Sequence, residues 1–152
     1  MQLISDAFEH NQPIPLLYTC DGKDTNPPLS FGDVPDGAKS LALIMEDPDV
    51  PQSIRPDGMW DHWLIWNMPP NTTDIPEAGT PPGVEGSNTG GKIGYGGPCP
   101  PDRRHRYFFK LFALDAMLDL PASASKSELE KAIEQHVIDR ALLVGTYTRS
   151  AR

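Results

Sequence analysis

Three short clusters of ionisable, aromatic and rigid residues are the parts of this chain that could bind a ligand or act on one. The first is Asp47–Pro51, the second is Trp60–Trp63, and the third joins Gly96–Pro101 to His105–Tyr107. Each cluster lies beside an apolar run of strand length. Because loops at strand ends present functional groups on a rigid scaffold, this pattern predicts one shared polar pocket.

Two imidazoles and a carboxylate supply the acid–base chemistry of these clusters. Asp47 ends one apolar run, His62 begins the next, and His105 begins a third. In a meander these strand ends meet at one rim. The histidines could then donate hydrogen bonds to an anion while the carboxylate orients a ring and raises its pKa. Gly96 and Gly97 would let backbone N–H groups approach the same anion.

Two other chemistries are weaker alternatives. Histidine and aspartate are ligands for zinc or iron, which keeps a metal-dependent enzyme using Asp47, His62 and His105 as an alternative. However, no His-x-His or His-Glu-x-x-His spacing places two ligands on one element. Nucleophilic hydrolysis lacks a Gly-x-Ser-x-Gly motif. Cys99 lies between prolines, where nothing lowers the pKa of its thiol. We therefore assign no catalytic residue and no cofactor.

The elements that must position these clusters are mainly strands. Apolar or aromatic runs predict strands at 40–46, 62–68, 106–114 and 142–147, with a short strand at 29–31. The 17 prolines and 13 glycines predict many loops and strand edges. Strand runs dominate, which favours a mainly antiparallel β-sandwich over a doubly wound α/β fold.

One main peripheral helix is expected at about 127–138. Ser127 and Glu130 have the spacing of a capping box. The apolar stripe that follows comprises Leu129, Ala132, Ile133, His136 and Val137. By contrast, residues 69–103 contain no convincing element, and a loop of this length is usually functional or disordered.

Length and charge limit the function classes. The 152 residues fit a single domain, 1–152. A net charge of −8 repels a phosphate backbone and argues against general nucleic-acid binding, although a locally positive pocket can still take an anion. No apolar run approaches the roughly 18 residues of a membrane span. No signal peptide is visible in residues 1–20, so a cytoplasmic location is expected by default.

The two cysteines leave two interpretations open. Cys20 and Cys99 both lie in loop-like settings, and neither has a Cys-x-x-Cys partner. They are either free thiols or a disulfide that ties the N-terminal loop to the proline-rich loop. Such a bridge would stabilise the fold by a few kcal/mol.

In their order along the chain, these motifs resemble the phosphatidylethanolamine-binding protein (PEBP) family, also called Raf-kinase-inhibitor-like. The short prokaryotic YbhB/YbcL branch is the most similar. The resemblance covers nearly the whole chain. Its matching segments are Tyr18–Gly22, Asn26–Leu29, Ser40–Leu43, Asp47–Pro51, His62–Trp63, Tyr95–Pro101, His105–Tyr107 and Leu143–Tyr147.

The resemblance implies a sandwich of antiparallel sheets with Greek-key connections and a small pocket for phosphate or phospholipid-headgroup-like anions. It also implies a role in modulating a kinase or protease. By motif position, Asp47, His62 and His105 form the polar core of the pocket. The expected wall comprises Pro51, Trp60, Gly96, Gly97, Pro98 and Tyr107.

Two departures from animal members of the family bear on this pocket. Those members carry an extra helix after the final strand, whereas this sequence ends at Arg152, so we expect a more open pocket. Asp61 stands directly before His62, where animal members carry another histidine. We expect Asp61 to favour a protonated His62 and to weaken the net attraction for an anion.

The sequence is therefore interpreted as that of a non-enzymatic binding protein. Its ligand would be phosphate or a phosphoethanolamine-like anion, and its protein partner a kinase or a protease. A protein–protein regulator with a vestigial pocket is a further alternative. The long loop and the edge strands leave a homodimer open.

Overall fold

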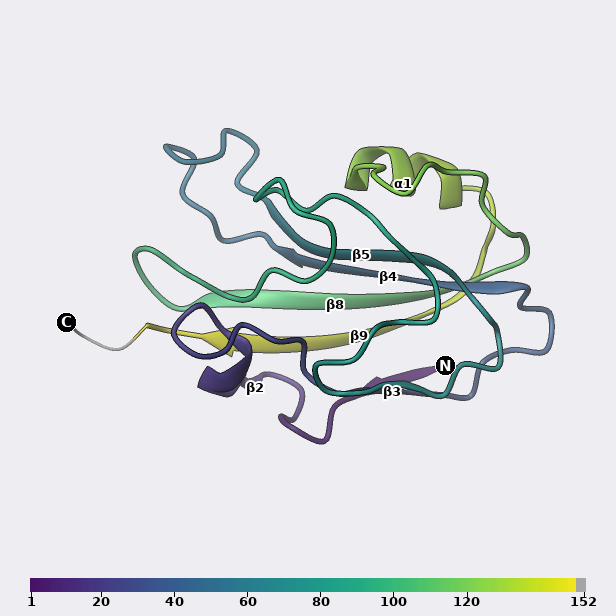
Figure 1. Ribbon diagram of the computed structural model, residues 1–152, viewed down its shortest axis with the longest axis horizontal. Coiled ribbons are helices and arrows are strands. Elements are labelled where there is room, and N and C mark those ends of the chain that lie inside the picture. Colours follow the sequence, from purple (N-terminus) through teal and green to yellow (C-terminus); the bar gives the residue numbers. More distant parts are fainter. Residues whose placement is uncertain (150–152) are drawn as a thin grey trace.

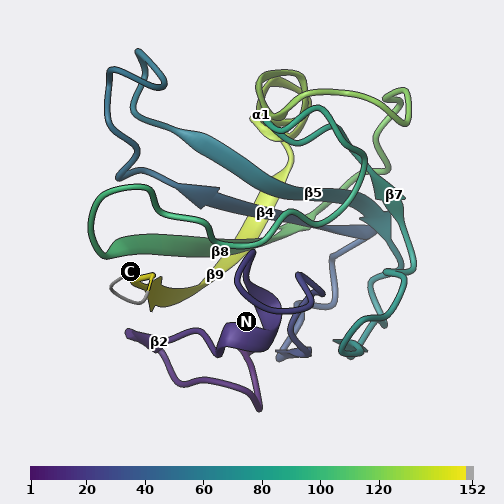
Figure 2. The ribbon, with the colours of Figure 1, turned by 60° about the vertical axis from the view of Figure 1, so that its left-hand side comes forward.

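The computed structural model describes residues 1–149, which form two packed β-sheets with a helix outside the larger one (Figures 1 and 2). The larger sheet has the strand order β2 (Gln12–Pro13), β9 (Val137–Tyr147), β8 (His105–Leu114), β4 (Ser40–Asp47), β5 (Trp60–Met68) and β7 (Val84–Glu85). The smaller sheet has the order β1 (Gln2–Ile4), β3 (Leu29–Gly32) and β6 (Asp74–Ile75). Neighbouring strands are antiparallel, except for the parallel pair β2–β9. The predicted mainly antiparallel sandwich is confirmed.

Strand β4 is central because both of its faces are covered. Leu41, Leu43 and Met45 belong to the core between the two sheets. Ala42 and Ile44 belong to a second core beneath helix α1 (Lys126–Ile133). Every residue of this strand is buried, which explains why its sequence is continuously apolar rather than alternating.

The helix begins earlier and ends earlier than the predicted span of 127–138. Ser125 is its N-cap, and Glu128 completes the capping box, so the same Ser-x-x-Glu pattern operates two residues upstream. The helix ends at Ile133 because Val137 already pairs with Leu114 as the first residue of β9. Hydrogen bonds between β8 and β9 therefore take the place of the last helical turn that the sequence predicted. No helix within residues 1–149 is both long and apolar enough to cross a bilayer.

The segment 69–103 is an ordered connection with little regular structure. It contributes one short strand to each sheet, β6 and β7, and an isolated bridge between Ser87 and Ile93. A disulfide joins Cys20 to Cys99, which decides between the two interpretations of the cysteines. The backbone N–H of Cys20 also donates to the carbonyl oxygen of Pro98 at 3.1 Å. The proline-rich loop is thus fixed to the N-terminal loop.

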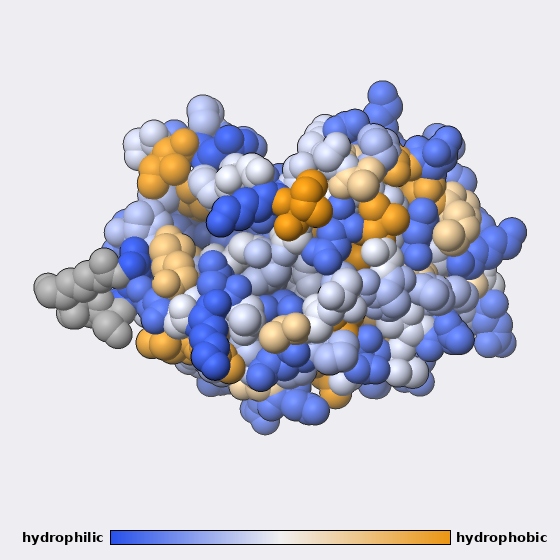
Figure 3. Space-filling model, in the orientation of Figure 1, coloured by the Kyte–Doolittle hydropathy of each residue, from blue (hydrophilic) through white to orange (hydrophobic). Residues whose placement is uncertain are grey.

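The face of the molecule seen in Figure 3 is mostly hydrophilic, with separate apolar patches. A notch divides the part that carries the β4–β5 connection from the part that carries α1, as Figure 3 shows in the orientation of Figure 1. A short 3₁₀ helix, η1 (Leu16–Tyr18), leads into the N-terminal loop that the disulfide fixes.

Candidate functional site

One rim of the larger sheet brings the three predicted polar side chains together. Asp47 ends β4, His62 lies near the start of β5, and His105 begins β8. Strand β4 lies between the other two, and both of its pairings are antiparallel. The end of β4 therefore meets the starts of β5 and β8, as the meander argument predicts.

A cavity of about 440 Å³ opens at this rim. It is lined by the side chains of the rim, by the β4–β5 connection and by the long segment before β8. Both cysteines of the disulfide line it as well. Its ionisable lining residues are Asp24, Asp47, His62, Lys92, Tyr95 and His105.

His62 occupies a β-bulge. Met45 pairs with Trp63 and Glu46 pairs with Asp61, so β5 has one extra residue at this point, and that residue is His62. Bulges re-aim side chains and are common beside functional sites. The bulge gives His62 a position in the cavity wall, which the pattern of the strand alone did not indicate.

His62 is a neutral ring with a defined tautomer. Its Nδ1 lies 2.6 Å from the carbonyl oxygen of Gly96, and a carbonyl only accepts, so Nδ1 carries the proton. Burial lowers the pKa of His62 to about 4, because the charged form would lose its hydration. The ring of Tyr107 packs edge-on against it, with ring centroids 5.3 Å apart. At neutral pH, Nε2 is therefore an acceptor.

Asp61 does not act on His62 in the way that the sequence led us to expect. Its carboxylate lies 3.0 Å from the Nζ of Lys126, at the start of α1. The Asp61 charge is thereby neutralised on the helix side of the sheet. Burial dominates at His62 and lowers its pKa, so the expectation of a protonated His62 is wrong.

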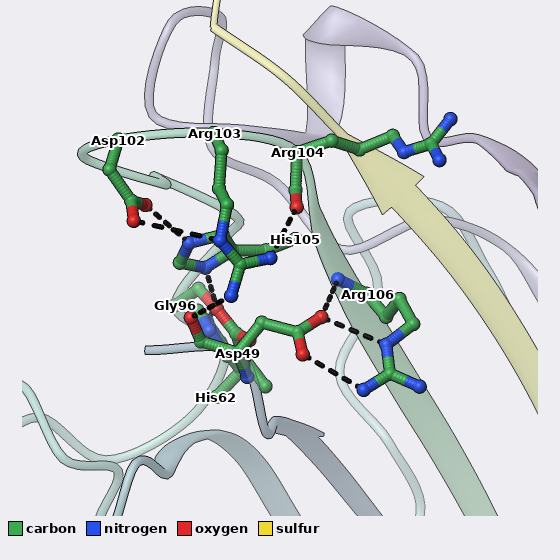
Figure 4. Close-up of polar contacts among 9 residues, drawn as sticks. Asp49, His62, Gly96, Asp102, Arg103, Arg104, His105 and Arg106 are labelled. Carbon is green, nitrogen blue, oxygen red and sulfur yellow. Dashed lines mark hydrogen bonds and ion pairs between the residues drawn. The ribbon is translucent and has the colours of Figure 1, made fainter. Parts of the chain in front are cut away.

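His105 is held between two carboxylates. Its Nδ1 lies 2.6 Å from Oδ2 of Asp47, and its Nε2 lies 2.6 Å from Oδ1 of Asp102. Because carboxylate oxygens accept, a ring that donates from both nitrogens satisfies both contacts. Burial raises the pKa of Asp47. The hydrogen bond from His105 lowers the pKa of Asp102. Figure 4 shows Asp102 reaching back to the His105 ring from the loop before β8.

Asp49 has a structural role beside the cavity. Its carboxylate accepts from Nε and Nη2 of Arg106 at 2.9 and 2.8 Å, and from the backbone N–H of Arg106 at 2.9 Å (Figure 4). This fork holds the β4–β5 connection against the start of β8. Arg106 also lowers the pKa of Asp49.

The two glycines that were expected to offer free N–H groups have both donors in use. The N–H of Gly96 donates to the carbonyl oxygen of His62 at 2.9 Å. The N–H of Gly97 donates to Oδ1 of Asp24 at 2.7 Å. A Cβ at Gly97 would also collide with the backbone oxygen of Tyr18, so close packing alone requires a glycine there.

A sequence model of the phosphatidylethanolamine-binding protein family matches residues 4–148. The chain belongs to this family. A UPF0098 protein of Chlamydia pneumoniae is 51% identical over 150 residues, which are 99% of this chain and 100% of the relative.

Solved structures agree with the PEBP assignment. The crystal structure of a putative PEBP homologue from Chlamydia trachomatis has a TM-score of 0.95 and 48% identity, covering 98% of this chain and 97% of that one. Escherichia coli YbcL, described as a member of the mammalian PEBP family, has a TM-score of 0.88 and 28% identity, covering 98% of each chain. The likeness therefore extends over the two-sheet fold and the rim that carries the cavity.

The residues predicted by PEBP motif position divide into those that line the cavity and those behind it. The lining group comprises Asp47, Trp60, His62, Gly96, Gly97 and His105. The others support it. Tyr107 packs on His62, Pro51 accepts backbone hydrogen bonds from Ile54 and Arg55, and Pro98 accepts one from Cys20. Binding by any of them stays a prediction.

Sequence reasoning missed several residues of this PEBP cavity. The missed lining residues include Asp24, Val50, Ile54, Asn88, Lys92 and Tyr95. Tyr95 stood in a quoted motif, and its hydroxyl donates to the carbonyl oxygen of Tyr18 at 2.7 Å. Asp24 lies outside the three clusters and Lys92 lies shortly before Gly96, and no motif of the predicted pocket included either of them. Asp102 had one available signal, its spacing of three residues from His105.

One polar group behind the cavity and one in its wall have no side-chain partner within residues 1–149. The hydroxyl of Tyr107 is buried, and nothing in residues 1–149 forms a hydrogen bond with it. The ammonium group of Lys92 forms no ion pair within the described part of the chain, and it lies in the cavity wall.

The geometry offers no support for a metal ion held by Asp47, His62 and His105. Both ring nitrogens of His105 face carboxylates, so the ring has no free nitrogen for a metal in this arrangement. Across residues 1–149, no three His, Cys, Asp or Glu side chains are grouped as a metal site.

Proposed function

We propose that this PEBP-family protein binds small phosphoryl-type anions without acting on them, and that the cavity at the β4–β5–β8 rim is the binding site. One observation carries the proposal: the donors of this site already hold oxyanions. His105 holds the carboxylates of Asp47 and Asp102, and the N–H of Gly97 holds that of Asp24. Carboxylate and phosphate oxygens are recognised by the same charge-assisted hydrogen bonds.

The remaining groups of the cavity suit a phosphate that carries a proton or an amine. Lys92 supplies a positive charge in the wall. Nε2 of neutral His62 accepts a hydrogen bond, so it can pair with the hydroxyl of hydrogenphosphate or with an ammonium group. Asp24 offers a carboxylate to the same ammonium group. Phosphate and phosphoethanolamine are therefore the simplest ligands to test.

The thiol chemistry of the site favours a binding protein over an enzyme. Cys20 and Cys99 line the cavity, but they are joined to each other, and neither is a thiolate nucleophile. Neutral His62 donates to a backbone carbonyl rather than activating a hydroxyl.

The partner, the location and the assembly remain further proposals. Modulation of a kinase or protease rests on the resemblance, as does a vestigial pocket in a pure protein–protein regulator. The cytoplasmic location is opposed by the disulfide, because such bonds persist mainly in oxidising compartments. A homodimer is also proposed, and a measurement of the molecular mass in solution would distinguish it from a monomer.

The experiment is a titration of the native protein, labelled at histidine with ¹⁵N, with inorganic phosphate and then with phosphoethanolamine. The ring signals of His62 and His105 should shift and saturate at millimolar ligand. His136, which pairs with Asp115 at the far end of β8, is the internal control and should not move. Unmoved signals of His62 and His105 would sink the proposal. A larger effect of phosphoethanolamine than of phosphate would indicate that the amine is recognised too.

A further inference from the structure

Asp102 closes the outer side of His105. Its Oδ1 lies 2.6 Å from Nε2, and the side chain of His105 has no exposed surface, whereas that of Asp102 is 41% exposed. A ligand in the cavity or in solvent cannot reach Nε2 while the carboxylate is in place. The nitrogen that would donate to an anion is therefore occupied by an anion of the protein itself.

Asp102 is not needed to orient the ring. Asp47 already holds Nδ1 at 2.6 Å from inside the fold, and its side chain is only 4% exposed. A buried carboxylate on one ring nitrogen is enough to fix the ring plane. The contact from Asp102 is a second, external one. Residues 101–104 are all exposed, so this loop can release the carboxylate without opening the core.

The backbone of Gly97 shows the same arrangement. Its N–H is the other donor that the sequence assigned to an anion, and Oδ1 of Asp24 occupies it at 2.7 Å. Asp24 lies in the N-terminal loop, and Asp102 lies in the loop before β8. Two independent loops thus each place a carboxylate on a donor of the same cavity.

We propose that Asp102 is a built-in competitor for the ligand, and that it sets the specificity of the site. The inference rests on the proposed function. An incoming phosphoryl oxygen replaces the Asp102 carboxylate on Nε2 of His105, and the Asp102 side chain turns out to solvent.

Such a competitor selects by charge and by the number of oxygens. A simple carboxylate such as acetate can form the same hydrogen bonds to His105 as Asp102 does. It must also lose translational and rotational freedom when it binds from solution, which Asp102 does not. A phosphoryl dianion carries more charge and more oxygens than a monocarboxylate, and the cavity that it would enter is lined by His105, Gly97 and Lys92. The site therefore rejects monocarboxylates and accepts phosphoryl dianions.

The test compares phosphate affinity in the wild-type chain and three variants. Asp102→Ala removes the competitor, and Asp102→Asn keeps the shape but removes the charge. Asp115→Ala is the matched control, because it removes one charge and one histidine partner at the opposite end of β8. Asp102→Ala should bind phosphate about tenfold more tightly, as expected for loss of a charge-assisted contact. Asp102→Asn should lie between Asp102→Ala and wild type, and Asp115→Ala should match wild type.

Two further readouts separate displacement from a simple change of charge. In the wild-type protein, the side-chain carboxyl ¹³C signal of Asp102 should move to its free position when phosphate saturates the site. In Asp102→Ala, millimolar acetate should weaken phosphate binding, which it should not do in wild type. An Asp102 carboxyl signal that stays unmoved at phosphate saturation overturns the inference.

The affinities also separate the inference from the function on which it rests. If wild type binds phosphate and Asp102→Ala binds it equally or less well, the inference is wrong and the proposed function stands. If neither protein binds phosphate, both are wrong. Unfolding curves of the variants check that each remains folded.

Discussion

At the scale of single residues, burial decides the chemistry of His62. The ring has lost its water, so its pKa falls to about 4 and it enters the cavity wall neutral. The Gly96 carbonyl then fixes the proton on Nδ1. The site is therefore mixed: His62 offers a lone pair, His105 offers N–H donors, and Lys92 offers a charge. If the site binds phosphate as proposed, this set of groups would favour one protonation state of the ligand.

The depressed pKa of His62 makes the stability of the fold depend on pH. Between about pH 6.5 and pH 4 the unfolded chain binds a proton at His62 that the folded protein does not, so stability falls as pH is lowered through this window. The loss amounts to about 3 kcal/mol. Urea unfolding of wild type and His62→Gln at pH 7 and pH 4.5 checks this. The variant should lose less stability, and equal losses would contradict the assignment.

The buried hydroxyl of Tyr107 has no hydrogen-bond partner within residues 1–149, so its removal should affect ligand affinity and fold stability differently. Tyr107→Phe removes a buried group without a partner, so the free energy of unfolding should stay constant or rise by about 1 kcal/mol. If a ligand or its water satisfies the hydroxyl, phosphate affinity should fall several-fold in the same variant. Calorimetry and a phosphate titration measure the two effects. A clear loss of stability would mean that the hydroxyl is already satisfied.

The main polar residues of the site could be predicted from the sequence, but the protonation state of His62 and the full cavity lining could not. Asp47, His62 and His105 stand in motifs at strand ends, which is information that a sequence carries. The neutral state of His62 depends on its burial and on its position in the β5 bulge, which exist only in the folded chain. Asp24 and Lys92 line the cavity from loop positions outside the quoted motifs, and no local pattern predicts that placement.

At the scale of elements, helix α1 tests how capping selects a helix start. Two Ser-x-x-Glu patterns overlap, and the structure uses the one that begins at Ser125. Ser125→Ala should lower the free energy of unfolding by about 1 kcal/mol. Ser127→Ala is the matched control and should have little effect, because Ser127 is inside the helix and exposed. Urea unfolding distinguishes the two, and equal effects would contradict the assigned N-cap.

The disulfide connects two loops that form part of the cavity wall. Cys20 and Cys99 are 79 residues apart, so their bridge restricts the unfolded chain strongly. Replacing both by serine should cost about 2 to 4 kcal/mol. It should also weaken phosphate binding, because the loops that carry Asp24 and Gly97 are released. Unfolding and titration with and without reductant measure both effects. A reductant-insensitive wild type would contradict the bridge.

Element boundaries show where sequence patterns stop being informative. The apolar runs of β4, β5 and β8 were found because these strands are long and lie in the core. The two-residue strands β2, β6 and β7 are too short for any periodicity. The start of β9 was missed because residues 137–138 were assigned to the helix and because the charged residues Asp139 and Arg140 interrupt the apolar run before Leu142.

At the scale of the whole molecule, the order of motifs carried more information than any motif alone. Turn-like and core-like residues, each ordinary by itself, converge on one rim because β4 lies between β5 and β8. The acidic chain, with its net charge of −8, then surrounds a small set of donors that it already fills with its own carboxylates. Under the proposed function, this arrangement would make the site selective for a strongly charged small anion.

The most direct test of ligand binding at the β4–β5–β8 rim is a crystal structure of the native protein with bound phosphate, at a resolution that shows water. One phosphate is expected in the cavity, with an oxygen within hydrogen-bond distance of Nε2 of His105 and the Asp102 side chain turned to solvent. A cavity that holds only water at saturating phosphate, with the Asp102–His105 contact intact, would contradict both the proposed binding site and the displacement of Asp102.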